Sequence, residues 1–256
     1  MATLTAVQRE LLRSDIWFSQ VPLALAEALM SLALLKTLRD GEALFRRGEA
    51  VDGLYAVLDG GLHITGVTRE GREAMLSLIE PPMWFGEIAL FDRLPRTHDA
   101  VAEGATTLLF VPLSALDTLL DASPLYWRHF GVLMAFKVRM AFIALEDLAI
   151  VQPAERLARR LVWLTYCAVT GGEMGRRRLT IKQTQLALMM SLSRQTVNQL
   201  LRALEQRGVI RLSYGLIDVL DTAALVDAAM LTPVERRMLE RSGFFLPTTS
   251  TTTITS

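Results

Sequence analysis

Five long polar side chains in the last third of the chain could point the same way from one predicted helix. They are Arg194, Gln195, Asn198, Gln199 and Arg202. Guanidinium and carboxamide groups can form paired hydrogen bonds with the edges of nucleic-acid bases, or contact phosphates. The same pattern is also typical of an ordinary amphipathic helix with a solvated polar face. The surrounding sequence decides between these two interpretations.

A helix-turn-helix between Ile181 and Ile210 would hold these side chains in place. Counted from Gln183, Ala187 is the fifth residue, where two crossing helices require a small side chain. Ser193 can cap the second helix by accepting a hydrogen bond from a backbone N–H two or three residues later. The apolar positions of that helix recur at helical spacing and predict a buried stripe: Val197, Leu200, Leu201 and Leu204. Two short apolar runs joined by a Ser-Tyr-Gly turn, 209–212 and 216–220, predict the strands of a wing.

Basic residues concentrate around this segment. Residues 176–211 contain only one acid, Glu205, although the formal net charge of the whole chain is zero. The same range contains eight basic residues: Arg176, Arg177, Arg178, Lys182, Arg194, Arg202, Arg207 and Arg211. Such a local excess is typical of a surface that binds a polyanion. It favours DNA recognition over a merely solvated face. We expect the contacts to come from Lys182, Ser193, Arg194, Gln195, Asn198, Gln199 and Arg202.

A second constellation lies between residues 84 and 100. Gly86 and Glu87 stand at a predicted strand-to-helix turn, and Arg96 and Thr97 at the return to the next strand. Backbone N–H groups at a helix start favour an anion, and the planar guanidinium of Arg96 can bind a phosphate. Glu87 could accept from a ribose hydroxyl. An ion pair between Glu87 and Arg96 that closes a turn would explain the same spacing, so both interpretations stay open here.

The segment around this constellation has the pattern of an antiparallel barrel. Glycine recurs every several residues and separates short strand-like runs at 43–45, 54–58, 62–65, 74–79 and 107–111. Evenly spaced short strands of this kind predict a compact jelly roll. Residues 36–123 carry fourteen acids and eight bases, so this part of the chain is acidic where the helix-turn-helix is basic.

A long helix should follow the barrel. Between Pro124 and Pro153 there is no further proline, and after Gly131 there is no glycine. A seam of apolar residues spaced three and four apart runs along it: Met134, Val138, Ala141, Leu145 and Leu148. Such a seam can pack within one chain or against a second copy. Because aromatic residues occupy the other faces as well, we expect a parallel homodimer.

These patterns predict an α+β chain in five parts. A helical lead-in at 1–35 has leucines at helical spacing up to Leu35, and the jelly roll covers 36–123. The dimerisation helix covers 124–152, the winged helix-turn-helix domain 153–230, and a partly disordered tail 231–256, with a further helix after Pro233.

Composition argues against several other classes of protein. The single cysteine, Cys167, lies in an apolar run and is expected to be a buried structural thiol, and the three histidines lack metal-ligand spacing. No nucleophile–base pair or pair of acids suggests an enzyme. Uncharged runs are too short to span a bilayer, and charges interrupt the start where a signal peptide would be apolar. We therefore expect a cytoplasmic protein without a metal centre.

The order of these parts resembles the CRP/FNR family of bacterial transcription regulators. The segments that carry the resemblance are DGEALFRRGE (40–49), GLYAVLDGG (53–61), FGEIAL with PRT (85–97) and LSRQTVNQLLRALEQRGV (192–209). The resemblance covers the chain from about Trp17 to Val226. It implies a cyclic-nucleotide-binding-type jelly roll, a dimerisation helix and a winged helix-turn-helix.

The resemblance also implies particular ligands and partners. The family's phosphate-binding pattern falls on Gly86, Glu87, Arg96 and Thr97, which implies a cyclic nucleotide or cyclic dinucleotide effector. Members that bind cyclic AMP place hydroxyl residues where this chain has Ala141 and Phe142, whose side chains form no hydrogen bonds, and this argues against cyclic AMP. Double-stranded DNA, a second copy of the chain and RNA polymerase are the implied partners.

Two related functions remain as alternatives. One is a regulator of the same fold that needs no ligand, and the other is a nucleotide sensor that acts on a protein partner. The basic excess after residue 175 favours DNA over a protein partner. In the second helix only Arg194 matches the family's usual pattern, with Gln195 and Gln199 differing. We therefore expect an operator different from the best-known one of the family.

Overall fold

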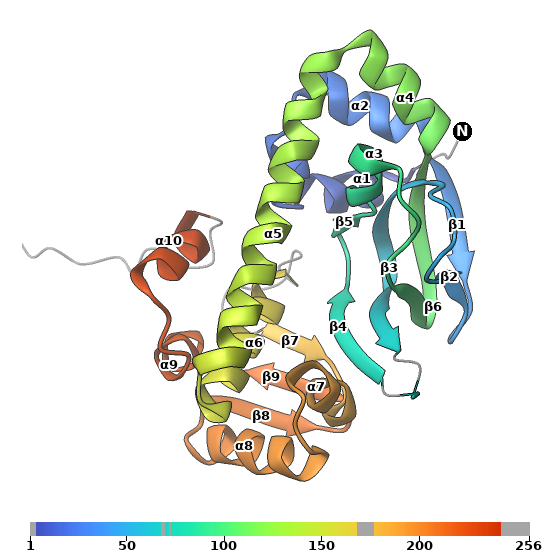
Figure 1. Ribbon diagram of the computed structural model, residues 1–256. Coiled ribbons are helices and arrows are strands. Elements are labelled where there is room, and N and C mark those ends of the chain that lie inside the picture. The colour runs from blue at the N-terminus through green and yellow to red at the C-terminus, as the bar shows by residue number, and fades with distance from the viewer. Residues whose placement is uncertain (1–3, 68–69, 72, 168–176, 242–256) are drawn as a thin grey trace, which may run out of the picture.

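The chain folds into an N-terminal sheet and a C-terminal domain joined by one long helix (Figure 1). The computed structural model describes residues 4–67, 70–71, 73–167 and 177–241. The predicted α+β class is confirmed, with a jelly-roll-like antiparallel sheet, a long connecting helix and a helix-turn-helix in that order. No helix in these ranges is long and apolar enough to cross a membrane.

Three short helical elements precede the sheet: α1 (Ala6–Arg13), η1 (Phe18–Gln20) and α2 (Leu23–Leu32). Asp15 organises the turn between the first two, because its Oδ1 accepts the backbone N–H groups of Trp17 and Phe18. Our prediction that helical structure extends to Leu35 is wrong for the last residues. The backbone is already extended at Ala33, and Leu35 pairs with Leu109 in strand β1 (Leu34–Leu38).

The N-terminal sheet is antiparallel and has the strand order β1-β6-β3-β4. Its remaining members are β2 (Ala43–Phe45), paired with β6 (Asp99–Pro112), and β5 (Trp84–Phe85), paired with β3 (Gly53–Val67). β4 spans Glu73–Ile79. The runs 54–58 and 62–65, predicted as two strands, form the single strand β3 with register shifts between them. Gly60 takes φ +75 there, and a Cβ would meet Ala105 O at 2.4 Å, so the glycine marks a bulge and not a turn.

An aromatic cluster joins the N-terminal helices to the sheet and to the long helix. The ring of Phe18 stacks on that of Trp84 at 4.9 Å between centroids, and Trp17 lies 5.5 Å from Phe130. Trp17 Nε1 donates to His129 O at 2.7 Å, which satisfies its polar atom in the partly buried site. The lead-in therefore fixes the sheet against the first turns of the long helix.

The long helix is α5 (Trp127–Ile150), which follows α3 (Ile88–Asp92), α4 (Leu113–Ala122) and the short turn η2 (Pro124–Tyr126). Its 24 residues make a rod of about 36 Å at 1.5 Å per residue. Only Phe130, Leu133 and Asp147 of this helix are buried. Val151 leaves the helical conformation, and Pro153 opens the next helix, as the sequence predicts for a hinge at this proline.

The C-terminal domain packs helices around a small sheet of order β7-β9-β8. Its elements are α6 (Pro153–Cys167), β7 (Arg177–Thr180), α7 (Gln183–Met190), α8 (Arg194–Gln206), β8 (Ile210–Ser213), β9 (Leu216–Val219), α9 (Thr222–Ala228) and α10 (Pro233–Arg241). The side chain of Cys167, predicted to be a buried thiol, lies outside the described part of the chain, as do Arg176 and the residues after 241.

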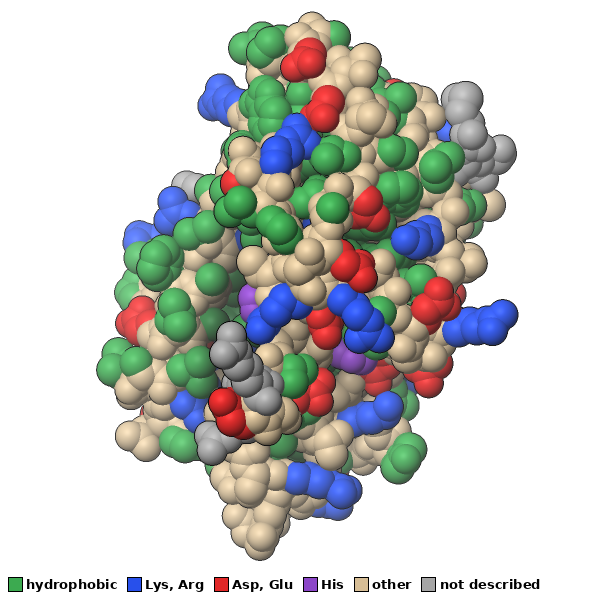
Figure 2. All heavy atoms as spheres, turned by 45° about the vertical axis from the view of Figure 1, so that its right-hand side comes forward, with side chains coloured by type: hydrophobic (Ala, Val, Ile, Leu, Met, Phe, Trp, Pro, Cys, Tyr) green, Lys and Arg blue, Asp and Glu red, His purple; other side chains and the backbone are tan. Residues whose placement is uncertain are grey.

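The C-terminal domain also touches the N-terminal sheet directly. Met75 and Leu78 of β4 belong to the same buried cluster as the apolar side chains of α6, α7 and α8. Arg160 Nη2 of α6 donates to Leu76 O at 3.1 Å. Acidic and basic side chains lie next to one another around the middle of the face shown in Figure 2.

Candidate nucleic-acid interface and effector site

The turn between α7 and α8 fixes the start of the second helix. Ser191 takes a left-handed conformation with φ 52, which costs a side chain about 1 kcal/mol where glycine would cost nothing. Two residues later, Ser193 caps α8 by accepting from Thr196 N at 3.0 Å, as predicted. Val197, Leu201 and Leu204 are buried under the helix, while Leu200 is half-buried. The opposite face of α8 therefore points to solvent.

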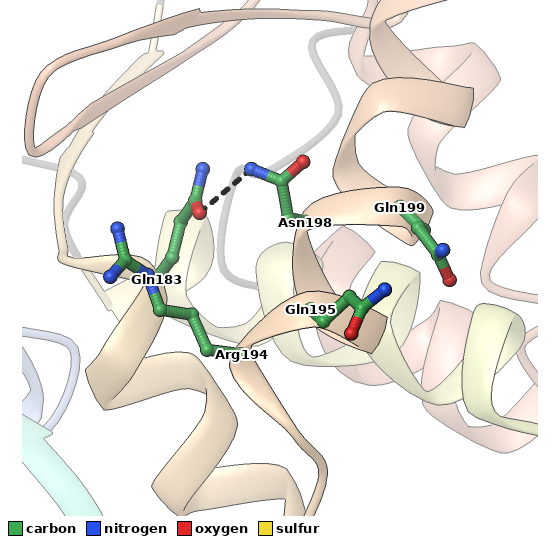
Figure 3. Close-up of a pocket in the computed structure, with 5 residues that line it drawn as sticks. All are labelled: Gln183, Arg194, Gln195, Asn198 and Gln199. Atoms are coloured by element: carbon green, nitrogen blue, oxygen red, sulfur yellow. Dashed lines mark hydrogen bonds between the residues drawn. The ribbon is translucent and has the colours of Figure 1, made fainter.

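The polar side chains of that face form an open hollow (Figure 3). Arg194, Gln195 and Gln199 are exposed, and Arg194 extends back beside Gln183 of α7. Asn198 is half-buried, and its Nδ2 donates to Gln183 Oε1 at 2.9 Å. That hydrogen bond orients the Asn198 carboxamide and leaves its oxygen free to accept from a ligand. The face offers one cation and several amides, which suits both phosphate oxygens and base edges.

Glu205 ties α8 to the wing. One oxygen of its carboxylate pairs with Arg202 Nη1 at 2.6 Å, and the other accepts from Leu212 N of β8 at 2.8 Å. Both contacts lower the pKa of Glu205 below its usual value, and the hydrogen bond from Leu212 N–H has the larger effect. Tyr214 is fully exposed at the tip of the wing, where Gly215 takes φ +68. The exposed side chain of Arg202 is thus held by its ion pair with Glu205, whereas Arg194 has no ion pair among the described residues.

Lys182 meets the N-terminal sheet. Its Nζ lies 3.0 Å from Glu103 Oε1 of β6, and this carboxylate also accepts from Gln185 Nε2. The hydrogen bond from Lys182 to Glu103 raises the pKa of the lysine. Burial, together with the negative charge of Glu103, raises the pKa of Glu80 to about 7. The Lys182 side chain is still 64% exposed, so it faces both Glu103 and solvent.

Arg96 and Gly86 come together inside the N-terminal sheet. Arg96 Nη2 pairs with Asp52 Oδ1 at 2.8 Å and donates to Gly53 O at 3.1 Å. Its guanidinium lies 4.2 Å above the ring of Phe45. A Cβ on Gly86 would approach Arg96 Nη1 to 3.4 Å and Gly53 O to 3.0 Å. The φ of Gly86, +97, also favours glycine, so a side chain at this turn would be strained and would crowd the guanidinium.

Glu87 points to the long helix and not to Arg96. Its carboxylate is 1% exposed and pairs with Lys137 Nζ of α5 at 2.7 Å. The same Nζ donates to Trp84 O at 2.8 Å. Thr97 is exposed, and its hydroxyl contacts His98 Nδ1 at 2.9 Å. The ion pair between Glu87 and Arg96 that the sequence left open does not form, because each residue has a different charged partner.

An exposed apolar stripe runs along α5. Val138, Phe142 and Leu145, spaced four and three residues apart, are 45%, 67% and 61% exposed. Leu148 and Ala141 are exposed as well, whereas Met134 is half-buried. The predicted seam therefore lies mainly on an open face. Phe142 lies on the same stripe, although it is one of the aromatic residues that we expected on the other faces of this helix. Helical spacing alone could not separate these adjacent positions.

Several side chains at these sites had no signal in the sequence. Asp52 and Lys137 lie 44 residues before and 50 residues after the residues that they pair with, Arg96 and Glu87. Only the folded sheet and its packing against α5 bring such pairs together. Gln183 could have been found, because it opens α7 at the position from which the helix-turn-helix pattern is counted. Tyr214 could also have been found, as the large residue in a tight turn.

Two family models match this chain. The cyclic nucleotide-binding domain matches residues 35–123, and the Crp-like helix-turn-helix domain matches residues 155–228. The first range contains Arg96 and Glu87, and the second contains α7, α8 and the wing.

Curated relatives match over most of their length. The Cyclic AMP receptor protein of Thermus thermophilus is 30% identical over 74% of this chain and 85% of that protein. A CRP-like cAMP-activated global transcriptional regulator of Mycobacterium tuberculosis is 29% identical over the same shares. The names of these relatives describe a cyclic AMP receptor and a cAMP-activated transcriptional regulator.

Solved structures show the same architecture. A crystallised transcriptional regulator of the CRP/FNR family from Thermus thermophilus has a TM-score of 0.61 and 26% identity, covering 77% of this chain and 99% of that one. The structure of FixK2 from Bradyrhizobium japonicum has a TM-score of 0.70 over 78% of this chain and 98% of that one, and at 19% identity it supports the fold alone.

Proposed function

This chain belongs to the CRP/FNR family of DNA-binding transcription regulators, and we propose that it acts as a homodimer that recognises a palindromic operator through two copies of α8. It carries the family's cyclic-nucleotide-binding domain and is not an enzyme. The observation that carries the proposal is the open polar face of α8, held by the Ser193 cap and flanked by exposed Arg194 and Arg202.

The DNA contacts follow from the chemistry of this face. Arg194 can donate two parallel hydrogen bonds to a guanine, and Gln195 or Gln199 can both donate to and accept from an adenine. Ser193, Asn198, Arg202 and Lys182 surround them and suit phosphate or base contacts. To these sequence-predicted residues we add Gln183, which orients Asn198, and Tyr214 at the wing tip.

The dimer follows from the open stripe on α5. Val138, Phe142 and Leu145 present apolar surface at heptad spacing on a helix that buries only three of its 24 side chains within the chain. Such a stripe is favourable only when another apolar surface covers it. A parallel second copy places two α8 helices on one side of the dimer, about 34 Å apart if they enter successive major grooves. RNA polymerase is then the partner that a DNA-bound activator would contact.

Selection of bound duplexes from a random pool tests the DNA assignment. We expect a palindromic site with a guanine contacted by Arg194 and with adenines at positions read by Gln195 and Gln199. A matched selection with the Arg207→Ala variant, altered at the far end of α8, should return the same site. Recovery of no common sequence, or of one that is not symmetric, would contradict recognition by a homodimer.

The effector proposal rests on Arg96. Its Nε is buried and has no hydrogen-bond partner among the described residues, and a side chain in place of Gly86 would crowd the same guanidinium. These features fit the phosphate of a cyclic nucleotide or cyclic dinucleotide, which could take a pair of hydrogen bonds from Arg96. The carboxylate of Glu87 suits a ribose hydroxyl. Ala141 and Phe142 provide no hydrogen-bonding side chain for a base, so the sugar-phosphate carries the recognition.

A regulator without an effector is the second candidate, favoured by the two ion pairs. Asp52 neutralises Arg96, and Lys137 neutralises Glu87, so both charges of the site already have partners within the chain. A phosphate would have to compete with Asp52 for the guanidinium. The side-chain exposure of Asp52, 43%, shows that this carboxylate can exchange its partner for water without being buried unpaired.

Titration calorimetry with a panel of cyclic mono- and dinucleotides separates these candidates. If a phosphate displaces Asp52, Asp52→Asn should bind about tenfold more tightly than the wild type, because the competing charge-assisted hydrogen bond is gone. Arg96→Ala should not bind, whereas Arg93→Ala, three residues earlier and exposed, should bind like the wild type. If neither the wild type nor Asp52→Asn gives a binding heat with any nucleotide of the panel, the result supports the regulator without an effector.

A further inference from the structure

A buried ion cluster joins three helices where the long helix meets the C-terminal domain. Arg159 of α6 stands at its centre, and its Nη1 lies 2.8 Å from Asp147 Oδ1 of α5 and 3.1 Å from Glu235 Oε1 of α10. Arg159, Asp147 and Glu235 are 8%, 7% and 5% exposed. The cluster thus connects the last turns of the proposed dimer helix to both ends of the domain that carries α8.

The guanidinium of Arg159 is also bonded to the backbone. Its Nε donates to Ala229 O at 2.9 Å and its Nη2 to Met230 O at 3.0 Å, at the turn between α9 and α10. All three nitrogens therefore have acceptors. A planar guanidinium with this many fixed partners allows only one relative placement of the elements that supply them. The neighbouring apolar contacts lack such directionality.

The position of Asp147 gives the cluster its significance. It lies between Leu145 and Leu148, which are exposed on α5, but points to the other side of the helix. Val151, where α5 ends, follows one turn later, and Arg159 lies beyond it in α6. The ion pair therefore spans the hinge. A change in hinge angle would have to break it, and the buried Asp147 would then lose its charged partner.

Helix α10 is the second anchor of this arrangement. It starts after residue 228, where the match to the Crp-like helix-turn-helix domain ends. Glu235 Oε2 accepts from Thr232 N at 2.7 Å, so its carboxylate is oriented before it meets Arg159. In Figure 1, α9 and α10 lie on the side of α5 opposite to the sheet. The hinge is thus held from a direction that the sheet does not reach.

We propose that Arg159, Asp147 and Glu235 form a clamp that sets the angle between the dimer helix and the DNA-binding domain, and so sets the operator spacing. This inference rests on the proposed function, because spacing matters only if two α8 helices bind one duplex. Half-sites must lie close to one helical turn apart for both helices to enter the major groove. The three residues are positioning residues, and none of them touches the DNA.

The test compares a full palindromic operator with a duplex that carries one half-site. Glu235→Gln should lower the affinity for the palindrome about tenfold, since simultaneous binding of two misplaced helices loses much of its avidity. The half-site affinity should stay within about twofold, because α8 itself is unchanged. The matched control is Arg236→Gln, which removes the exposed pair with Asp227 from the same helix and should change neither affinity.

A second variant separates positioning from simple loss of folding. The triple change Asp147→Leu, Arg159→Met and Glu235→Leu replaces the cluster by apolar side chains, a kind of exchange that often keeps stability. We expect a folded dimer that selects operators with a broader range of spacings from a random pool. Wild-type spacing in this variant, or an equal loss on half-site and palindrome for Glu235→Gln, would overturn the clamp.

The same measurements separate this inference from the proposed function. A wild-type protein that binds the palindrome no better than the half-site would contradict the homodimeric function and, with it, the clamp. If the wild type prefers the palindrome and the clamp variants show the same affinities for palindrome and half-site as the wild type, only the clamp is contradicted. Light scattering on each variant reports the dimer, and thermal unfolding followed by circular dichroism reports the fold.

Discussion

The double variant Phe142→Glu, Leu145→Glu is expected to be monomeric and to lose about a hundredfold in affinity for a palindromic operator. Both side chains are more than half exposed on α5, so the substitutions leave the fold of one chain intact. In a parallel dimer they would place four carboxylates along one seam, where burial and mutual repulsion oppose association. Light scattering gives the mass, and fluorescence anisotropy gives the affinity.

Leu125→Glu is the matched control for the seam. This leucine is 86% exposed in η2, just before α5, and lies outside the stripe. It tests whether a glutamate in place of an exposed leucine disturbs the protein in general. A dimer that persists in the double variant would show that Val138, Phe142 and Leu145 do not form the contact between the two copies.

Arg194→Ala is expected to lower the affinity for the selected operator by about 1–3 kcal/mol, the contribution of a paired contact to guanine. Arg194 is exposed at the first position of α8, and its removal leaves the Ser193 cap and the buried stripe in place. Adding Arg202→Ala should abolish specific retention in a gel shift. That second change also releases Glu205, which keeps its bond to Leu212 N.

Two readouts distinguish base recognition from general attraction to DNA. Loss of a guanine contact should relax the sequence preference at one position, whereas loss of a phosphate contact weakens all sequences alike and reduces the salt dependence. Arg207→Ala removes another arginine side chain, at the C-cap of α8, 13 residues after Arg194. It should change neither the sequence preference nor the salt dependence. Unchanged operator binding by the Arg194, Arg202 double variant would refute the assigned DNA-binding face.

Local patterns predicted the elements better than their partners. Helix α8, its cap and its buried stripe were predictable because helical spacing and capping act within a few residues. The end of α2 and the unbroken strand β3 were not, since pairing with β6 decides both. A strand can override the helical spacing of a few leucines when its ladder partner is distant in sequence.

The candidate sites divide in the same way. Arg96 and Glu87 were singled out from their neighbours in the sequence, but their partners are distant: Asp52 lies just before β3 and Lys137 lies in α5. The cluster around Arg159 was missed entirely, because Asp147, Arg159 and Glu235 are ordinary charged residues on three predicted helices. Their burial follows from how those helices pack, and no spacing within one helix encodes it.

The contact of Lys182 and Gln185 with Glu103 has a thermodynamic consequence. The first helix of the DNA-binding motif and the strand β6 share one carboxylate, so the two domains are energetically linked and not merely tethered. If an effector in the sheet changes the affinity for DNA by some factor, DNA must change the affinity for that effector by the same factor. An effector too weak to detect on the free protein can therefore become measurable on the operator complex.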